Sequence, residues 1–257
     1  MPHVARIIVY PIKSLDGCEL TTAHVLPSGA LQHDRRWALV DANGSPVNGK
    51  RQPLLHRIRA LFEADLETVE LIDGGGSCQF HLPTEREAAS EWFSAVVGTA
   101  CRLEEDLASG FPDDVDAAGP TIIGSGSLAA VSGWYSKVSQ DEMRRRLRAN
   151  LEIEDCPPFW EDGLVQAGGS SAFTVGPVTF RGRRICQRCV VPSRDSRTGE
   201  ALSGFAASFV RRRRESLPDW SPREHFDHFY RIAVNTELVS RQNGAAICVG
   251  DRVAHDA

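Results

Sequence analysis

The chain is organised around a short stretch that holds two cysteines three positions apart, Ile185-Cys186-Gln187-Arg188-Cys189-Val190-Val191-Pro192-Ser193-Arg194-Asp195-Ser196-Arg197-Thr198-Gly199. Three arginines, Arg183, Arg184 and Arg188, lie beside the two sulfurs in the sequence. Neighbouring cations stabilise a thiolate relative to a thiol, and a thiolate is either a nucleophile or a soft metal ligand. The role of this stretch therefore depends on the groups that the fold brings to it.

Length and composition are those of a soluble globular protein with one large domain or two small ones, since the chain has 257 residues, 42% of them hydrophobic. The net charge of −5 argues against generic nucleic-acid binding. The sequence has no apolar run of membrane-spanning length and no signal-peptide pattern, so we expect no membrane partner. Seven cysteines, an odd number, suit a reducing compartment, and we expect a cytoplasmic location.

The first eighty residues have the pattern of an all-β unit, a small barrel or a strongly curled sheet. Asn43-Gly44 is a hairpin turn signal, and a helix is predicted from an N-cap at Thr84 to about Val97. Residues 104–119 are acidic and irregular, which favours a junction or a cofactor-covering loop. Strands are predicted at residues 4–10, 19–26, 37–41, 58–62, 68–72 and 79–82.

The second half mixes strands with a few helices. Its G-x-G-x-x-A string at residues 124–129 lacks the firm strand and the parallel sheet of a dinucleotide site, so Ser125 or Ser127 is expected to cap a helix instead. Ser139 and Glu142 form a capping box before a helix that ends near Arg148. Further elements are predicted at residues 151–153, 173–180, 202–214, 229–234 and 246–249, which gives a β-rich α+β fold with a few flanking helices.

Several polar side chains stand where an element ends. Lys13 and Ser14 follow the first strand, Arg35 precedes the strand at residue 37, and Arg148 and Asn150 follow a helix. A cation beside a hydroxyl or an amide at such a boundary is suited to hold an anion. Each group taken alone has an ordinary explanation, a solvated loop lysine or an arginine paired with an aspartate.

The cysteine pair has three alternative explanations. A structural zinc site would need two more ligands, and His225 and His228 lie too far from Cys189 for finger spacing. A thioredoxin-like dithiol acting through Cys186 and Cys189 belongs at a strand-to-helix corner, whereas Val190-Val191-Pro192 predicts an extended exit. Two inert buried thiols are the third possibility, because free cysteine often belongs to a core. The motif alone leaves these alternatives open.

Six short motifs occur in one order along nearly the whole chain, from about residue 4 to residue 253. Together they resemble the MOSC proteins (molybdenum cofactor sulfurase C-terminal domain) that carry an N-terminal β-barrel, and in particular the mitochondrial amidoxime-reducing component and its bacterial counterparts. The motifs are Tyr10-Pro11-Ile12-Lys13-Ser14, Asp34-Arg35-Arg36-Trp37, Arg146-Leu147-Arg148-Ala149-Asn150, Cys186-Gln187-Arg188-Cys189, Asp195-Ser196-Arg197-Thr198-Gly199 and Val249-Gly250-Asp251.

This resemblance implies an N-terminal barrel-like domain at residues 1–104 and a MOSC β-barrel domain at residues 105–257, with a molybdenum–molybdopterin cofactor between them. It implies that Cys189 binds the metal and is the catalytic residue, with Arg188 favouring its ionised form. Two departures from the family pattern are Ala149, where proline is usual, and Asp116-Ala117-Ala118, where hydroxyls are usual. The residues implied to bind the cofactor are Lys13, Ser14, Arg35, Asp116, Arg148, Asn150, Gln187, Arg188 and Tyr230.

The resemblance further implies a molybdenum-dependent oxidoreductase that reduces N-oxygenated small molecules. No C-x₄-C-x₂-C spacing of an iron–sulfur domain is present, so electrons are expected from a separate protein, for which Arg211, Arg212, Arg213 and Arg214 offer a docking patch. Cys156 matches a second family cysteine near the pocket. The alternative function is a carrier that binds the cofactor or a sulfur atom without turnover.

Overall fold

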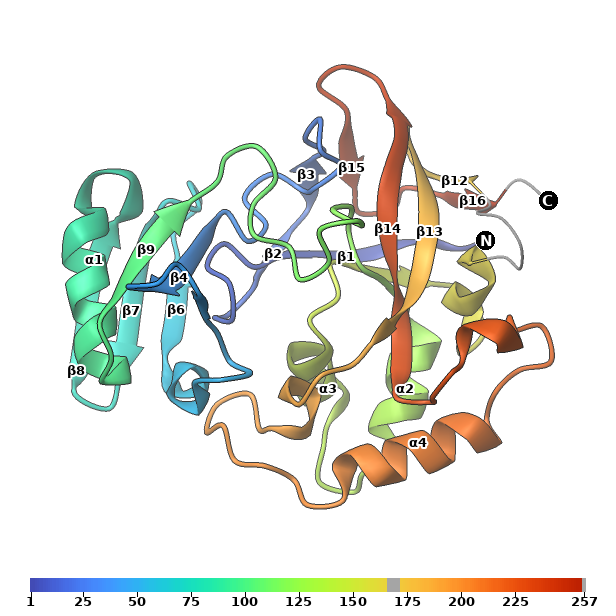
Figure 1. Ribbon diagram of the computed structural model, residues 1–257. Coiled ribbons are helices and arrows are strands. Elements are labelled where there is room, and N and C mark those ends of the chain that lie inside the picture. Colours follow the sequence, from blue (N-terminus) through green and yellow to red (C-terminus); the bar gives the residue numbers. More distant parts are fainter. Residues whose placement is uncertain (166–171, 256–257) are drawn as a thin grey trace.

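The computed structural model describes residues 1–165 and 172–255. Within these residues, four α-helices and sixteen β-strands form a β-rich α+β fold, which confirms the fold class expected from the sequence. Figure 1 shows small sheets with one helix at one side of the molecule and a large sheet with the other helices at the opposite side.

The large sheet has eight strands and draws on distant parts of the chain. They are β1 (His3–Val9), β2 (Cys18–Leu20), β10 (Ile122–Gly124), β11 (Leu151–Glu154), β12 (Ala172–Val175), β13 (Val178–Gln187), β14 (Arg231–Arg241) and β16 (Val253–His255). Their order is β16-β12-β13-β14-β10-β11-β1-β2, and the neighbours are antiparallel except for the parallel pair β10 and β11. The first strand of the chain therefore belongs to the sheet of the second half.

This sheet curls into a barrel-like shape. An isolated bridge joins His3 to Arg252, and the Val253 amide donates to the Pro2 carbonyl at 2.9 Å, so the β16 edge returns to β1. The described strands form no continuous ladder at this junction. A separate two-stranded pair, β3 (Thr22–His24) with β15 (Ala246–Cys248), lies antiparallel nearby and contributes Ala23 and Ile247 to the same core.

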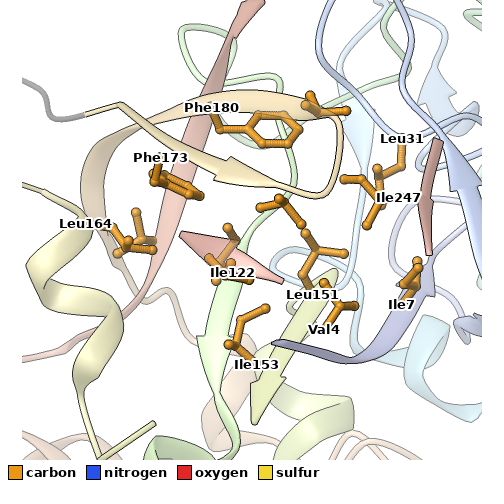
Figure 2. Close-up of a cluster of buried hydrophobic side chains, with 14 of the residues drawn as sticks. Val4, Ile7, Leu31, Ile122, Leu151, Ile153, Leu164, Phe173, Phe180 and Ile247 are labelled. Carbon is orange, nitrogen blue, oxygen red and sulfur yellow. The ribbon is translucent and has the colours of Figure 1, made fainter. Parts of the chain in front are cut away.

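The main core fills the inside of the curled sheet (Figure 2). In β1 the register shifts between Val4 and Arg6, and this bulge lets Val4, Ile7 and Val9 all bury their side chains completely. Phe173 and Phe180, paired across β12 and β13, are also fully buried. Burying each such side chain contributes about 1.5–3 kcal/mol.

The N-terminal strands that were expected to form one barrel or curled sheet divide into two three-stranded sheets. One has the order β5 (Pro46–Val47), β4 (Trp37–Asp41) and β9 (Cys101–Glu105), and the other β6 (Arg59–Phe62), β7 (Thr68–Asp73) and β8 (Gly76–His81). Helix α1 (Leu82–Val97) packs on them, and Trp37, Val69 and Phe93 form part of their shared core. The predicted turn at Asn43-Gly44 does connect β4 to β5, with Gly44 at φ +75°.

The predicted N-cap of α1 is wrong. Thr84 lies inside the helix, and His81 is the cap, because Pro83 in the first turn has a φ and a missing N–H that suit a helix start. Helix α1 ends where Gly98 takes the left-handed conformation, at φ +69°.

Three helices flank the large sheet: α2 (Ser125–Ser132), α3 (Gln140–Leu147) and α4 (Phe205–Glu215). The Ser139 cap of α3 is confirmed, since its hydroxyl accepts a hydrogen bond from the Glu142 amide at 3.1 Å, but the other half of the capping box is wrong: the Glu142 carboxylate bonds Arg146 and Ser196 instead of the Ser139 amide. The serine cap of α2 is wrong: Gly124 is the N-cap, and the Ser127 hydroxyl donates to the buried Glu161 carboxyl instead. None of the described helices is long and apolar enough to cross a bilayer.

Candidate functional site

A cavity of about 460 Å³ lies where the N-terminal sheets meet the curled sheet, and segments from both parts line it. Lining segments include the end of β1, the loop after β9, the end of α3 and the cysteine stretch. The polar residues that were predicted to hold an anion at the ends of strands and helices therefore line the same cavity. The predicted site residues that line this cavity are Lys13, Ser14, Arg35, Arg148, Asn150, Arg188 and Cys189.

Lys13 and Ser14 enter the cavity just after β1. The Lys13 amide donates to the Trp37 carbonyl at 2.8 Å, which ties this turn to β4. The Lys13 ammonium donates to the carbonyls of Phe111 and Pro112 and lies 3.2 Å from an Asp113 carboxylate oxygen. Burial lowers the pKa of Lys13, although Asp113 opposes that shift. The ammonium is thus already held by the loop that follows β9.

Arg35 pairs with its neighbour Asp34, as the ordinary explanation of this arginine anticipated. The Asp34 carboxylate also accepts the Tyr10 amide at 2.9 Å, and the Arg35 amide donates to the Tyr10 carbonyl at 2.8 Å. These bonds fix the Arg35 backbone against the end of β1. The guanidinium still lines the cavity, so the aspartate orients the arginine there.

Arg148 caps the C-terminus of α3 and lies over the Tyr10 ring, with its guanidinium carbon 4.0 Å from the ring centroid. One terminal nitrogen donates to the Leu15 carbonyl at 2.6 Å, while the other is buried and has no hydrogen-bond partner. Burial lowers the pKa of Arg148. Asn150 uses its amide structurally, donating to the Ile8 carbonyl and accepting from the Thr121 amide.

Some of these cavity residues have unusual backbone conformations. Ser14, Arg35 and Arg148 have φ values of +74°, +50° and +53°, a region that residues other than glycine seldom occupy. Such conformations persist only when the surrounding structure enforces them, and they cluster at binding sites. The strain supports the view that the cavity is a built site.

The cysteine stretch leaves β13 at Gln187 and reaches the cavity through Arg188 and Cys189. The Arg188 guanidinium donates to the Cys186 sulfur at 3.2 Å and to the Leu147 carbonyl at 2.5 Å, while its Nε is buried without a partner. Burial alone would lower the pKa of Arg188, but the sulfurs of Cys186 and Cys189 raise it. The hydrogen bond thus goes to the Cys186 sulfur, while Cys189 interacts with Arg188 through charge.

Cys189 itself is half-buried, and within residues 1–165 and 172–255 its sulfur accepts one hydrogen bond, from the Val191 amide at 3.5 Å. The predicted extended exit after it is a 3-10 turn over Val191–Ser193, because Pro192 fits the first turn of a helix. Both thiols line the cavity, so neither is sealed in the apolar core.

Three predicted cofactor-binding residues lie outside the lining of this cavity. Asp116 is 70% exposed and pairs with Arg184 at 3.5 Å. Gln187 is exposed at the end of β13, where the strand's alternation turns its side chain away. Tyr230 packs edge-to-face on Phe209, and its buried hydroxyl has no partner among the described residues. Burial raises the pKa of Tyr230 to about 12, with Arg188 opposing the shift and Cys189 adding to it.

Two other predicted features also lie outside the cavity lining. Cys156 packs against the main core, and burial raises its pKa to about 12, with Glu161 adding to the shift. Arg213 cannot belong to a surface docking patch, because its side chain is 0% exposed and pairs with the equally buried Asp162. Its neighbours Arg211, Arg212 and Arg214 are exposed.

The structure adds cavity residues that sequence reasoning missed. His56 is buried and contacts the Gly49 carbonyl at 3.3 Å, and Arg194 donates to the same carbonyl at 3.0 Å. Lys50 lies 3.4 Å from the Asp113 carboxylate. Sequence signals for them were weak, since Lys50 follows an ordinary Asn-Gly turn and Asp113 is one acid among many in its loop.

The cavity has the chemistry of an anion site next to two thiols. Among the described residues, no carboxylate forms an ion pair with Arg148, Arg188 or Arg194, which all line it. A buried cation without a counter-ion is costly, and unpartnered N–H groups on Arg148 and Arg188 add to that cost. An anion bound here would supply the missing counter-charge and would accept hydrogen bonds from the unpartnered N–H groups. These residues therefore fit a phosphate-bearing cofactor.

Comparison with known proteins agrees with this chemistry. Residues 1–100 match the family model of the MOSC N-terminal beta barrel domain. The chain is 27% identical over 283 residues to the molybdenum cofactor sulfurase of Anopheles gambiae, which covers 87% of this chain and 35% of that protein. The corresponding enzyme of Drosophila mojavensis is 25% identical, covering 77% of this chain and 29% of that protein. The chain thus spans about a third of these relatives.

The mitochondrial amidoxime reducing component 2 of Bos taurus is 23% identical over 239 residues, covering 76% of this chain and 67% of that protein. The crystal structure of the YUAD protein from Bacillus subtilis aligns with 100% of this chain at a TM-score of 0.38 and 12% identity. The resemblance expected from the motifs is confirmed by the family model and by these relatives. Residues 1–100 thus match the MOSC N-terminal beta barrel domain, and the chain is similar to molybdenum cofactor sulfurases and to the mitochondrial amidoxime reducing component.

Proposed function

We propose that this chain binds a molybdenum–molybdopterin cofactor in the cavity and reduces N-oxygenated small molecules. One observation carries the proposal. Arg148 and Arg188, which lack a carboxylate partner among the described residues, line the same cavity as the Cys189 thiol. A phosphate needs such cations, and a soft metal needs such a sulfur. The amidoxime-reducing relative supports the choice of substrate class.

The roles of individual residues follow from their positions. Cys189, half-buried and free of side-chain partners, is proposed as the metal ligand and catalytic residue. Arg148 and Arg188 have unused N–H donors to offer to the anionic part of the cofactor, and Lys13, Ser14 and Arg35 lie at the same cavity wall. The bound cofactor would supply the two-electron redox chemistry.

Arg188 has a second role in this proposal. Its guanidinium bridges the Cys186 sulfur and the Leu147 carbonyl, which is one residue from Arg148. The bridge holds the cysteine stretch against the end of α3. The thiol of Cys189 and the cations of Arg148 and Arg188 therefore keep fixed relative positions before any ligand arrives, which lowers the ordering cost of binding.

A carrier that binds the cofactor without turnover is the second candidate. It is favoured by the molybdenum cofactor sulfurase relatives, of which this chain spans about a third. The same cavity residues would serve both functions, so only turnover separates them.

Electron delivery and location belong to the same proposal. A separate electron-transfer protein would dock at the exposed arginines of α4, Arg211, Arg212 and Arg214, since clustered charge mainly accelerates encounter. Arg213 is left out of this patch because it is buried. A cytoplasmic location remains our proposal from cysteine usage.

The decisive experiment compares Cys189→Ser with its matched control Cys186→Ser. Each protein is purified, its molybdenum is measured by mass spectrometry, and benzamidoxime reduction is followed with a chemical electron donor. We expect Cys189→Ser to lose reductase activity and most of its bound molybdenum, while Cys186→Ser keeps both. A fully active Cys189→Ser protein would rule out the ligand role.

The remaining outcomes separate the alternatives. Wild-type protein that holds molybdenum but turns over no N-oxygenated compound is a carrier. Disulfide reductase activity that survives without molybdenum and disappears in Cys186→Ser identifies a dithiol oxidoreductase, the remaining explanation of the cysteine pair.

A further inference from the structure

The loop between β9 and β10 crosses the cavity and is fixed at both sides of it. The Phe111 amide donates to the Arg35 carbonyl at 2.8 Å, and the Gly119 amide donates to the Thr236 carbonyl at 2.9 Å. Between these points, Asp114 pairs with Arg184 at 3.0 Å and accepts from the Asn235 amide at 3.1 Å. The backbone of this loop is therefore held in place next to the cations of the cavity.

Asp113 is the side chain of this loop that enters the cation cluster. Its carboxylate lies 3.2 Å from the Lys13 ammonium and 3.4 Å from that of Lys50. Burial alone would raise the pKa of Asp113, but Lys13, Arg35 and Lys50 lower it far below its ordinary value. Asp113 is thus an anion that the chain itself supplies to the place where the predicted phosphate-binding residues lie.

The ammonium of Lys13 has no donor left for another ligand. A lysine ammonium has three N–H donors, and here they face the Phe111 carbonyl, the Pro112 carbonyl and the Asp113 carboxylate. The two carbonyls belong to a backbone that is fixed at Arg35. Asp113 is held only by ion pairs, and its side chain is 54% exposed, so it is the partner that can leave.

We propose that Asp113 sets the specificity of this anion site: it competes with incoming ligands for Lys13 and Lys50, and it yields to a doubly charged anion such as a phosphate. A free monoanion such as a carboxylate carries the same single charge as Asp113. It competes poorly, because Asp113 is tethered to the chain and therefore has a high effective concentration at the site. A dianion interacts more strongly than a monoanion with the cations that act on Asp113, which are Lys13, Arg35 and Lys50.

The test uses the full chain prepared without cofactor, with inorganic phosphate and acetate as probes in isothermal titration calorimetry at low ionic strength above neutral pH. We expect the wild-type protein to bind phosphate weakly and acetate not at all. Asp113→Asn should bind phosphate about tenfold more tightly, because one charge-assisted competitor is removed, and should gain measurable acetate binding.

Asp116→Asn is the matched control. It removes the same charge from the same loop, but Asp116 pairs with Arg184 and lies outside the cavity lining. Its phosphate affinity should equal that of the wild type, whereas an equal gain in both variants would reduce the effect to net charge and overturn the proposal. Asp113→Ser, a second variant with a smaller side chain, should reproduce the gain of Asp113→Asn.

Other results also decide the question. An unchanged or weaker phosphate affinity in both Asp113 variants, or no phosphate binding by any of the proteins, contradicts the competitor role. Lys13→Ala should abolish the gain in the Asp113→Asn background. The inference rests on the proposed anion site, but the calorimetry involves no molybdenum, so its failure is distinct from a failure of the Cys189 experiment.

Discussion

Two arginines that lie over aromatic rings, the buried Arg213 and the half-buried Arg148, differ in whether a carboxylate pairs with them. Arg213 is 0% exposed and pairs with Asp162, which also accepts the Ser221 hydroxyl at 2.7 Å, and its guanidinium lies 4.0 Å from the Phe159 ring centroid. Arg148 also lies over an aromatic ring, that of Tyr10, but among the described residues its bonds go to a carbonyl and no carboxylate pairs with it.

The difference separates a structural charge from a binding charge. Taking an ion pair out of water costs several kcal/mol per ion, and Arg213 offsets part of that cost through Asp162, although its Nη1 also has no partner among the described residues. Arg148 has no such carboxylate among the described residues, and under the proposed function a bound anion would supply the counter-charge. The two arginines therefore differ in the carboxylate partner, which Arg213 has and Arg148 lacks among the described residues.

The largest effect should come from breaking the compensated pair. Arg213→Leu leaves Asp162 charged and unpaired in the core, and we expect the free energy of unfolding to fall by about 3–5 kcal/mol in urea denaturation. Arg212→Leu, its exposed neighbour on α4, is the control and should change stability by less than about 0.5 kcal/mol. Equal effects of the two substitutions would contradict the structural role of Arg213.

A second effect concerns pH, at Glu161 beside Asp162. Burial, and then the charge of Asp162, raise the pKa of Glu161 from 4.5 to about 7. The folded protein therefore keeps a proton that the unfolded chain has lost between these values, and this carboxyl lowers the free energy of unfolding as pH rises through that window.

Glu161→Gln should remove this dependence. The pKa of Glu161 is raised from 4.5 to about 7, so above pH 7 the free energy of unfolding of Glu161→Gln should exceed that of the wild type by about 3 kcal/mol. Below pH 4.5 the two proteins should not differ through this group. Denaturation at several pH values measures the difference. A stability difference that stays constant across the window would show that the buried carboxyl does not titrate there.

The smallest effect on stability is expected at the uncompensated arginine. Arg148→Leu orphans no carboxylate, so the free energy of unfolding should change by no more than about 1 kcal/mol. Phosphate affinity should nevertheless fall by about 1–3 kcal/mol, because a charge-assisted contact is lost. Urea denaturation and phosphate calorimetry test this, with Arg212→Leu as the control. A large loss of stability with an unchanged phosphate affinity would contradict the difference between Arg148 and Arg213.

Local patterns were enough to find much of the fold and of the candidate site. The strand at Trp37–Asp41 and the helix cap at Ser139 are confirmed because they depend on alternation and on neighbouring residues. Lys13, Arg35 and Cys189 could be placed in one site only because the motif order resembled a family; nothing local to any of them requires the others.

Tertiary contacts explain what the sequence did not reveal. The four arginines at the end of α4 indicated a solvated face, yet Phe205, Phe209 and Arg213 are spaced four apart and share the buried side of the helix. That spacing was the available signal. The direction of the Arg188 hydrogen bond, toward Cys186, depends on side-chain conformation, and the competing role of Asp113 depends on a loop path that no periodicity describes.

The pairing of β1 with β11 has a consequence for how the molecule acquires its structure. His3 faces Glu154, about 150 positions along the chain, and the predicted division of domains at residues 104 and 105 falls inside that span. During synthesis, β1 cannot pair with β11 until more than half of the chain has been made. Loop closure over that separation makes maturation slow, and it leaves an apolar strand open to misassociation until then.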